Sequence, residues 1–264
     1  MTRSRLRELS DRHGFRPNRA LGQNFVVDPN TVRRIARLAS VGPGDHVVEI
    51  GAGVGALTLA LVETGATVTA IETDRHLVPA LAEMIEGTDV RLVVADARDL
   101  DWADGLHRPS VLVANLPYNV ATPLVLDILD DVPEIERMLV MVQREAAERL
   151  AAQPGAAAFG LPSLKVAQWA EAEIVGSVTP EVFSPRPKVQ SSLLELRRRV
   201  EPRLTDHVEE TFALARAGFG QRRKMLRRSL AGLVTAGAFE RAGVDPQARP
   251  ETIDLDDWHR LASS

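Results

Sequence analysis

The stretch VVEIGAGVG (residues 47–55) decides which fold this 264-residue chain is predicted to have. An apolar run of the strand type comes first, three glycines at alternate positions follow, and a helix is predicted from about Ala56 to Glu63. Glycine lets a backbone approach a ligand closely, and the N-terminus of the helix behind it faces that ligand. Because dinucleotide sites usually show G-x-G-x-x-G, the G-x-G-x-G spacing favours a ligand other than NAD.

Acidic residues end the next two predicted strands. The strand 67–71 ends in Glu72, which stands 21 residues after Gly51, and the strand 91–94 is followed by Asp96. In an open α/β sheet these positions share the carboxyl edge, where ligands bind. Glu72 is expected to accept from the ribose hydroxyls of an adenosine moiety, and Asp96 to reach the adenine edge.

A fourth predicted strand, residues 110–114, stops at NLPYN (115–119). The side-chain oxygen of Asn115 can accept from an exocyclic amine, and the carbonyl of Leu116 is held extended by the proline that follows. Tyr118 adds a stacking face. These groups suit an adenine amino group, although an ordinary turn after a strand, with Tyr118 packed inside, explains the same residues.

The charge of the chain is balanced overall but unevenly distributed. There are 32 basic and 36 acidic residues, with nine arginines against three acids in residues 1–40, four basic against twelve acidic in 41–110, and twelve basic against five acidic in 186–228. This pattern is compatible with a nucleic acid held by the two flanks. Without cysteine there is no thiolate metal site, and no metal is expected. The absence of a signal-like or membrane-spanning apolar run predicts a cytoplasmic protein.

The loop VFSPRPKV (182–189) combines an aromatic residue with two cations. Its prolines stiffen it and are expected to hold Phe183 exposed, beside Arg186 and Lys188, as a stacked base and its phosphate require. The alternative is a rigid loop whose Phe183 lies in the core.

Basic helices are predicted at both ends of the chain. After about Pro202 the pattern is helical, with helices over 208–218 and 221–233, and the second carries a dense patch that favours phosphate contact. The helix 3–13 is either a solvated helix or an RNA-contacting arm. The cations of the patch are Arg222, Arg223, Lys224, Arg227 and Arg228.

Five motifs in order resemble one family: LGQNF (21–25), EIGAG (49–53), NLPYN (115–119), FSPRPKV (183–189) and QRRK (221–224). From about residue 15 onward the chain resembles a KsgA/RsmA-type ribosomal RNA adenine N6-dimethyltransferase. The resemblance implies a class I S-adenosylmethionine-dependent methyltransferase, with a Rossmann-like, seven-stranded, mainly parallel sheet and a small all-helical C-terminal domain. It also implies dimethylation of two adjacent adenines near the 3′ end of 16S rRNA in the small ribosomal subunit, and a role in ribosome biogenesis.

The same resemblance implies roles for single residues. Tyr118 and Phe183 would sandwich the flipped adenine, and Asn115 with Leu116 would accept from its amino group. The charge patterns described above, rather than the resemblance, predict that Arg186, Lys188, Arg222, Arg223, Lys224 and Arg227 contact RNA. The methyl donor would be held by Asn24, Val26, Gly51, Glu72, Asp96 and Asn115. The chain departs from the family at Ala52, often proline, and at Arg228, often asparagine.

We therefore expect a basic N-terminal arm (1–20), a catalytic domain (21–200) and a helical RNA-contacting domain (201–264), acting as a monomer. Three alternatives share part of the pattern. An Erm-type enzyme would modify large-subunit RNA, and an N6-adenine DNA methyltransferase would usually lack the C-terminal motif. In the third alternative the protein is an assembly factor, whose binding to the small ribosomal subunit matters more than its methylation of RNA.

Overall fold

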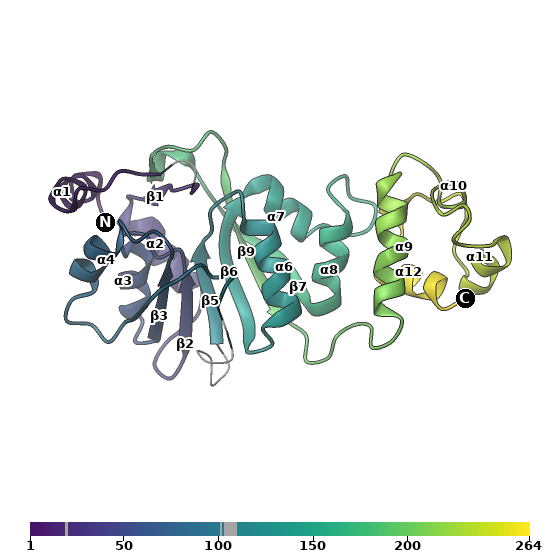
Figure 1. Ribbon diagram of the computed structural model, residues 1–264, viewed down its shortest axis with the longest axis horizontal. Coiled ribbons are helices and arrows are strands. Elements are labelled where there is room, and N and C mark those ends of the chain that lie inside the picture. The colour runs from purple at the N-terminus through teal and green to yellow at the C-terminus, as the bar shows by residue number, and fades with distance from the viewer. Residues whose placement is uncertain (19–20, 101, 103–109) are drawn as a thin grey trace. The chain divides into compact units, whose positions relative to one another are not determined.

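The computed structural model describes residues 1–18, 21–100, 102 and 110–264 (Figure 1). The described chain forms two compact units, and both are discontinuous in sequence. Unit 1 contains Met1–Ala147 and Glu173–Arg198, and unit 2 contains Glu148–Ala172 and Arg199–Ser264. This division differs from the predicted segments, since the helical unit takes in residues 148–172 and the described part of the N-terminal arm belongs to unit 1.

A seven-stranded sheet with the order β4-β3-β2-β5-β6-β9-β7 is the frame of the fold. The first five strands in this order, β4-β3-β2-β5-β6, pair in parallel, and β9 runs antiparallel to β6. This arrangement confirms the predicted class I methyltransferase sheet. Its strands are β2 (His46–Ile50), β3 (Thr67–Glu72), β4 (Arg91–Val94), β5 (Ser110–Asn115), β6 (Ile135–Gln143), β7 (Ala170–Val178) and β9 (Ser191–Arg198).

The helices of unit 1 begin and end where local chemistry dictates. The Asp28 side chain accepts from the backbone N–H of Thr31 at 2.9 Å and caps α2, whose first residue is Pro29. Gly14, with φ 71°, ends α1. These helices are α1 (Arg3–His13), α2 (Pro29–Leu38), α3 (Ala56–Val62), α4 (Val78–Ile85) and α6 (Ala121–Asp131); α7 (Arg144–Leu150) spans the boundary between the units.

A two-stranded ribbon pairs β1 (Phe25–Val26) with β8 (Phe183–Ser184), which follows the 3₁₀ turn Pro180–Val182. In this antiparallel pair Val26 lies opposite Phe183. Phe183 is 0% exposed and packs in a core cluster with Ile35 and Leu193. The expectation that the prolines hold Phe183 exposed is therefore wrong, because pairing with β1 turns its ring into the core.

Unit 2 has its own core around Trp258, which is fully buried together with Leu164, Leu226 and Leu230. Within the described chain its helices are α8 (Leu161–Trp169), α9 (Val208–Gly220), α10 (Leu226–Ser229), α11 (Ala236–Ala242), the 3₁₀ turn Pro250–Thr252 and α12 (Leu255–Ala262).

The predicted continuous helix 221–233 is wrong. Turns occupy 221–225, and only Leu226–Ser229 is helical. The backbone N–H of Leu226 donates to Ala248 O at 2.8 Å, and that of Arg227 donates to Pro246 O at 2.9 Å. Because a neighbouring loop satisfies these donors, a new helix begins at Leu226 instead of continuing from α9.

Candidate active site

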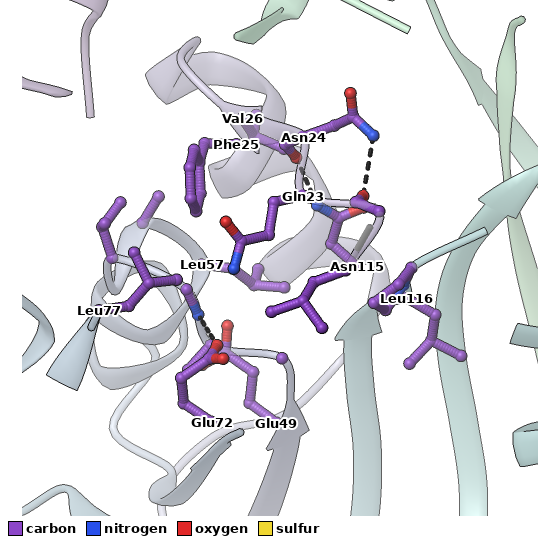
Figure 2. Close-up of a pocket in the computed structure, with 18 of the residues that line it drawn as sticks. Gln23, Asn24, Phe25, Val26, Glu49, Leu57, Glu72, Leu77, Asn115 and Leu116 are labelled. Atoms are coloured by element: carbon purple, nitrogen blue, oxygen red, sulfur yellow. Dashed lines mark hydrogen bonds between the residues drawn. The ribbon is translucent and has the colours of Figure 1, made fainter. Parts of the chain in front are cut away.

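Three segments of unit 1 converge on one cavity at the carboxyl edge of the sheet (Figure 2). They are the loop before β1, the glycine loop after β2 and the turn after β5. The cavity lining includes most of the predicted catalytic and donor-binding residues: Asn24, Val26, Gly51, Glu72, Asn115, Leu116 and Tyr118. Three of the five sequence motifs, LGQNF, EIGAG and NLPYN, thus meet in space.

The glycine loop follows β2 in a conformation that favours glycine. Gly51 has φ 73° and Gly53 has φ 60°, both in the left-handed region. A Cβ atom at Gly53 would lie 3.2 Å from the Phe25 ring, so this ring packs directly against the loop. The loop therefore needs glycine both for its backbone angles and for the close approach of β1.

The Glu72 carboxylate ties the glycine loop to the end of β3. Its Oε2 accepts from Gly53 N at 2.7 Å, and its Oε1 accepts from Asp74 N at 2.8 Å. The residue is 5% exposed, and burial raises the pKa of its carboxyl group. Each oxygen has a further lone pair, so the predicted contact with ribose hydroxyls fits this geometry.

Glu49, at the end of β2, is a second acidic residue of the cavity, and our prediction gave it no role. It is 2% exposed, and its Oε2 accepts from Thr58 Oγ1 at 2.5 Å. The pKa of this carboxyl group is raised to about 8, chiefly by burial and also by the nearby Glu72, while the Thr58 hydrogen bond acts in the opposite direction. Its place two residues before Gly51 was the available sequence signal.

Asn115 is oriented by a backbone contact. Its Nδ2 donates to the carbonyl of Asn24 at 3.1 Å, and the Asn24 side chain in turn donates to Gly22 O at 2.9 Å (Figure 2). Because the amide nitrogen is engaged, the side-chain oxygen is the atom left to accept from an incoming amine. Asn115 thus has the orientation that recognition of an exocyclic amino group requires.

Tyr118 lines the same cavity and is held at its hydroxyl. The Tyr118 hydroxyl and Ser191 Oγ lie 2.8 Å apart, and partial burial raises the pKa of the phenol. This contact anchors the ring at one end. Phe183 is absent from the described cavity lining, so the predicted pair of stacking rings is not assembled here.

Asp96 lies in an adjacent cavity that shares Gly51, Thr73 and Pro117 with the first. Its carboxylate makes an ion pair with Arg98, whose Nη2 lies 2.7 Å from Oδ2, and hydrogen bonds from Arg98 lower its pKa. Because the two cavities share these lining residues, their arrangement fits a ligand that extends from the glycine loop toward the end of β4.

The predicted RNA-binding cations differ in how firmly they are held. Arg222 donates to Ala157 O at 2.7 Å and lies 3.7 Å from Glu251 Oε2, so it is held by contacts within unit 2. Arg186 is paired with Glu181 at 2.5 Å. Four predicted cations are exposed without such a carboxylate contact among the described residues: Lys188, Arg223, Lys224 and Arg227.

Other cavity residues had no role in our prediction, although Gln23 and Phe25 belong to the LGQNF motif. Gln23 Nε2 donates to Asp74 Oδ2 at 2.7 Å, which connects the loop before β1 to the end of β3. Phe25 and Leu77 form apolar walls. Only the fold reveals these roles, since the residues come from separate segments.

Among the described residues, no group of histidine and acidic side chains is arranged to hold a metal ion. Within the same part of the chain, no helix is long and apolar enough to cross a membrane.

The sheet order, the antiparallel β9, the glycine loop and the acid ending β3 define a class I S-adenosylmethionine-dependent methyltransferase. The cavity fits this donor, since its apolar walls suit the nucleoside and the Glu72 carboxylate, already held by Gly53 N and Asp74 N, suits ribose hydroxyls. The family model described as ribosomal RNA adenine dimethylase matches residues 14–264. The chain belongs to the ribosomal RNA adenine dimethylase family.

Individual relatives agree with this assignment. The chain is 47% identical to a ribosomal RNA small subunit methyltransferase A of Kineococcus radiotolerans, over 98% of this chain and 89% of the relative. It is also 47% identical to the protein of that name in Thermobifida fusca, over 99% and 95%. The 23S rRNA methyltransferase ErmE has a similar structure, with a TM-score of 0.71 and 28% identity, covering 91% of this chain and 98% of ErmE.

A dimethyladenosine transferase from Plasmodium falciparum shares the fold, with a TM-score of 0.76 and 23% identity over 89% of this chain and 94% of that one.

Proposed function

We propose that this enzyme transfers methyl groups from S-adenosylmethionine to N6 of two adjacent adenines near the 3′ end of 16S rRNA, giving N6,N6-dimethyladenosine. Family membership supports the reaction, and the names of the relatives support the small subunit over the Erm-type alternative. The observation that carries the chemistry is the Asn115 amide, held by Asn24 O beside the donor cavity.

The donor would be held by Asn24, Val26, Gly51, Glu72 and Asp96. When bound, S-adenosylmethionine supplies an electrophilic methyl group on a sulfonium, which leaves as a neutral thioether. Glu72 is already fixed by Gly53 N and Asp74 N, so it is preorganised to accept from hydroxyl groups. The apolar side chains of Phe25, Val26 and Leu77 line the cavity and would keep water from the nucleoside.

Asn115 and Leu116 would act on the acceptor amine. The N6 lone pair of adenine is delocalised into the ring and is therefore a poor nucleophile. Acceptance of its hydrogens by Asn115 Oδ1 and the Leu116 carbonyl favours a pyramidal nitrogen with its lone pair directed outward. After the N–C bond forms, the amine is cationic and loses its proton readily to water.

Tyr118 would provide the stacking face for the extruded base. Extrusion costs a few kcal/mol, and stacking returns about 1–3 kcal/mol per base. In the conformation described here Phe183 supports this site from the core, as the partner of β1.

Exposed cations would contact the phosphates of the RNA. Lys188 and Arg186 belong to the loop after β8, while Arg223, Lys224 and Arg227 belong to unit 2. The proposed RNA-contacting domain is thus the helical unit, with residues 148–172 included. We further propose that the enzyme acts in the cytoplasm as a monomer.

The test is transfer of labelled methyl groups to small ribosomal subunits that lack the modification, with large subunits and duplex DNA alongside. Dimethyladenosine in small subunits alone is the expected product. Label in large subunits would instead assign the Erm-type activity, and binding without label anywhere would favour an assembly factor.

The Asn115→Ala variant tests the role of the amide. Turnover should become undetectable, because the acceptor of the amine hydrogens is lost, while donor binding is weakened but measurable, because the contact with Asn24 O is also lost. Rates come from methyl transfer and affinities from calorimetry. Asn30→Ala, at an exposed asparagine of α2, is the control. A near-normal rate for Asn115→Ala would refute the mechanism.

A further inference from the structure

Helix α1 lies outside the region matched by the family model, which begins at residue 14. The sequence left two interpretations open, a solvated helix or an RNA-contacting arm. The structure shows a third arrangement, because α1 contacts three elements of unit 1 that form or support the donor cavity.

The apolar face of α1 is buried. Leu6 and Leu9 are 6% and 0% exposed, and they share a core cluster with Phe25 and Leu77. Phe15, just beyond the helix, packs edge-on against Phe25, with the ring centroids 6.3 Å apart. The helix therefore covers the outer side of residues that reach the cavity.

The inner side of the same residues faces the donor site. Phe25 and Leu77 both line the cavity, and Phe25 also packs against Gly53 of the glycine loop. A single layer of side chains thus separates α1 from the cavity. Protein interiors are close-packed, so a gap behind this layer would be transmitted to the cavity wall.

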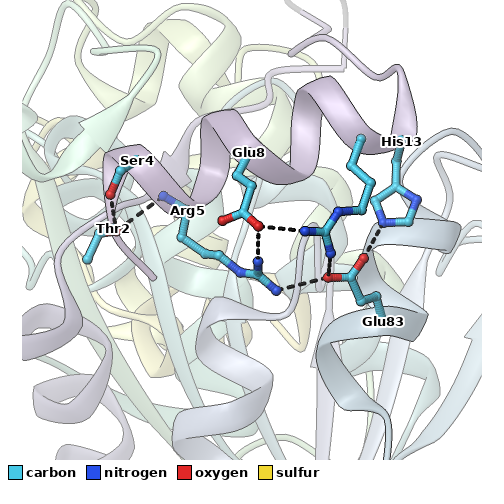
Figure 3. Close-up of polar contacts among 7 residues, drawn as sticks. Thr2, Ser4, Arg5, Glu8, His13 and Glu83 are labelled. Carbon is cyan, nitrogen blue, oxygen red and sulfur yellow. Dashed lines mark hydrogen bonds and ion pairs between the residues drawn. The ribbon is translucent and has the colours of Figure 1, made fainter.

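The polar side of α1 is joined to α4 through Glu83 (Figure 3). Arg5 and Arg12 lie 2.9 and 2.6 Å from Glu83 Oε1, and His13 lies 2.7 Å from Oε2. Glu8 bridges the two arginines on the helix itself. These pairings engage Arg5 and Arg12, two of the cations that a nucleic-acid-binding arm would present.

Arg3 connects α1 to the ribbon. Its Nη2 donates to the carbonyl of Glu181 at 2.6 Å and to that of Phe183 at 3.0 Å. Strand β8, which contains Phe183, pairs with β1, and β1 contributes Phe25 and Val26 to the cavity. A side chain at the start of the chain thus fixes the strand behind the donor-binding wall.

We propose that α1 is a positioning element of the methyl-donor cavity, acting through Phe25, Leu77 and the β1–β8 ribbon, with Arg3 and Leu9 as positioning residues. The proposal rests on the proposed function only in assigning this cavity to S-adenosylmethionine. Without the contacts of α1, β1 and the start of α4 would sample other positions, and the donor would bind a preorganised cavity less often.

The first test compares Arg3→Ala with Arg7→Ala in the full chain. Both arginines are exposed on α1, but only Arg3 makes the two carbonyl contacts. Calorimetric titration with S-adenosylhomocysteine should show affinity about three- to thirtyfold weaker for Arg3→Ala and unchanged for Arg7→Ala. Because Arg3 is exposed, the variant is expected to remain folded, and far-ultraviolet circular dichroism checks this.

The second test uses the buried leucine. Leu9→Ala should weaken donor binding, Leu9→Met should restore it, and Leu230→Ala, an equally buried leucine in unit 2, should lose stability without a change in donor affinity. Folded Arg3→Ala and Leu9→Ala proteins with normal affinity would overturn the proposal. Failure of the wild-type chain to bind S-adenosylhomocysteine would instead contradict the assignment of the cavity.

Discussion

The buried carboxyl group of Glu49 gives the stability of the fold a pH dependence. Its pKa is about 8 in the folded chain, raised chiefly by burial, against an ordinary value of 4.5. Between these values the folded state holds a proton that the unfolded state has lost, so stability falls as pH rises from about 4.5 to about 8. In the Glu49→Gln variant, stability should therefore fall less over this pH range than in the wild type.

Denaturant unfolding at several pH values between 5 and 8 measures the effect. Glu72 also has a raised pKa and contributes in the same direction, so the comparison of wild type with Glu49→Gln isolates Glu49. Glu86→Gln, at an exposed site, should behave like wild type. Identical pH slopes for wild type and Glu49→Gln would show that this carboxyl group is ionised in the folded chain.

For single residues, the sequence predicted which side chains lie at the site better than it predicted whether a side chain is exposed or buried. Gly51, Glu72 and Asn115 lie together as expected, because the ends of parallel strands meet at one edge. Phe183 does not line the cavity, because its burial depends on pairing with Val26, a contact between distant segments that local pattern does not encode. Glu49 was visible in sequence, but its raised pKa depends on the packing of α3 and β3 around it.

The basic segment 223–227, which carries Arg223, Lys224 and Arg227 over a turn and the start of α10, can be tested for RNA binding separately from its structural role. All three side chains are exposed, whereas Arg222 is bound to Ala157 O and lies near Glu251. Replacing the three with glutamine should weaken RNA binding and lower the slope of log K against log salt by about 2–3, since each lost phosphate contact removes about 0.7–0.9. Affinity for the methyl donor should stay the same.

Filter binding to the ribosomal RNA substrate over a salt series measures the slope. The matched control replaces Arg37, Arg91 and Arg216, three exposed arginines elsewhere, with glutamine and changes the net charge equally. A similar loss of slope in both triple variants would indicate a general charge effect. An unchanged slope in the first would remove the basic segment 223–227 from the interface.

The structure of this element could not be predicted from its own sequence. The spacing of Leu226 and Leu230 is helical, and both side chains are buried as expected. Their helix is nevertheless short, since the N–H groups at its start are satisfied by carbonyls of residues 246 and 248. The composition predicted an exposed basic surface. The path of the backbone, however, depended on contacts with a loop further along the chain.

For the whole molecule, the discontinuity of unit 2 determines which residues should unfold together. Residues 148–172 were assigned to the catalytic domain from sequence because they lie between predicted strands. In the structure Leu164, on α8, packs in one core with Phe212 of α9 and Trp258 of α12. Strand alternation indicates where the sheet is, but it does not show which core an inserted helix joins.

The Leu164→Ala variant tests this assignment. Leu164 is 0% exposed, and truncation of such a side chain costs about 2–5 kcal/mol, because a cavity is left behind. If α8 belongs to the cooperative unit of α9 and α12, hydrogen exchange should accelerate throughout these three helices, while β2 and β5 keep their protection. Acceleration confined to residues 161–169 would instead mean that α8 opens locally and that the core of unit 2 is stable without it.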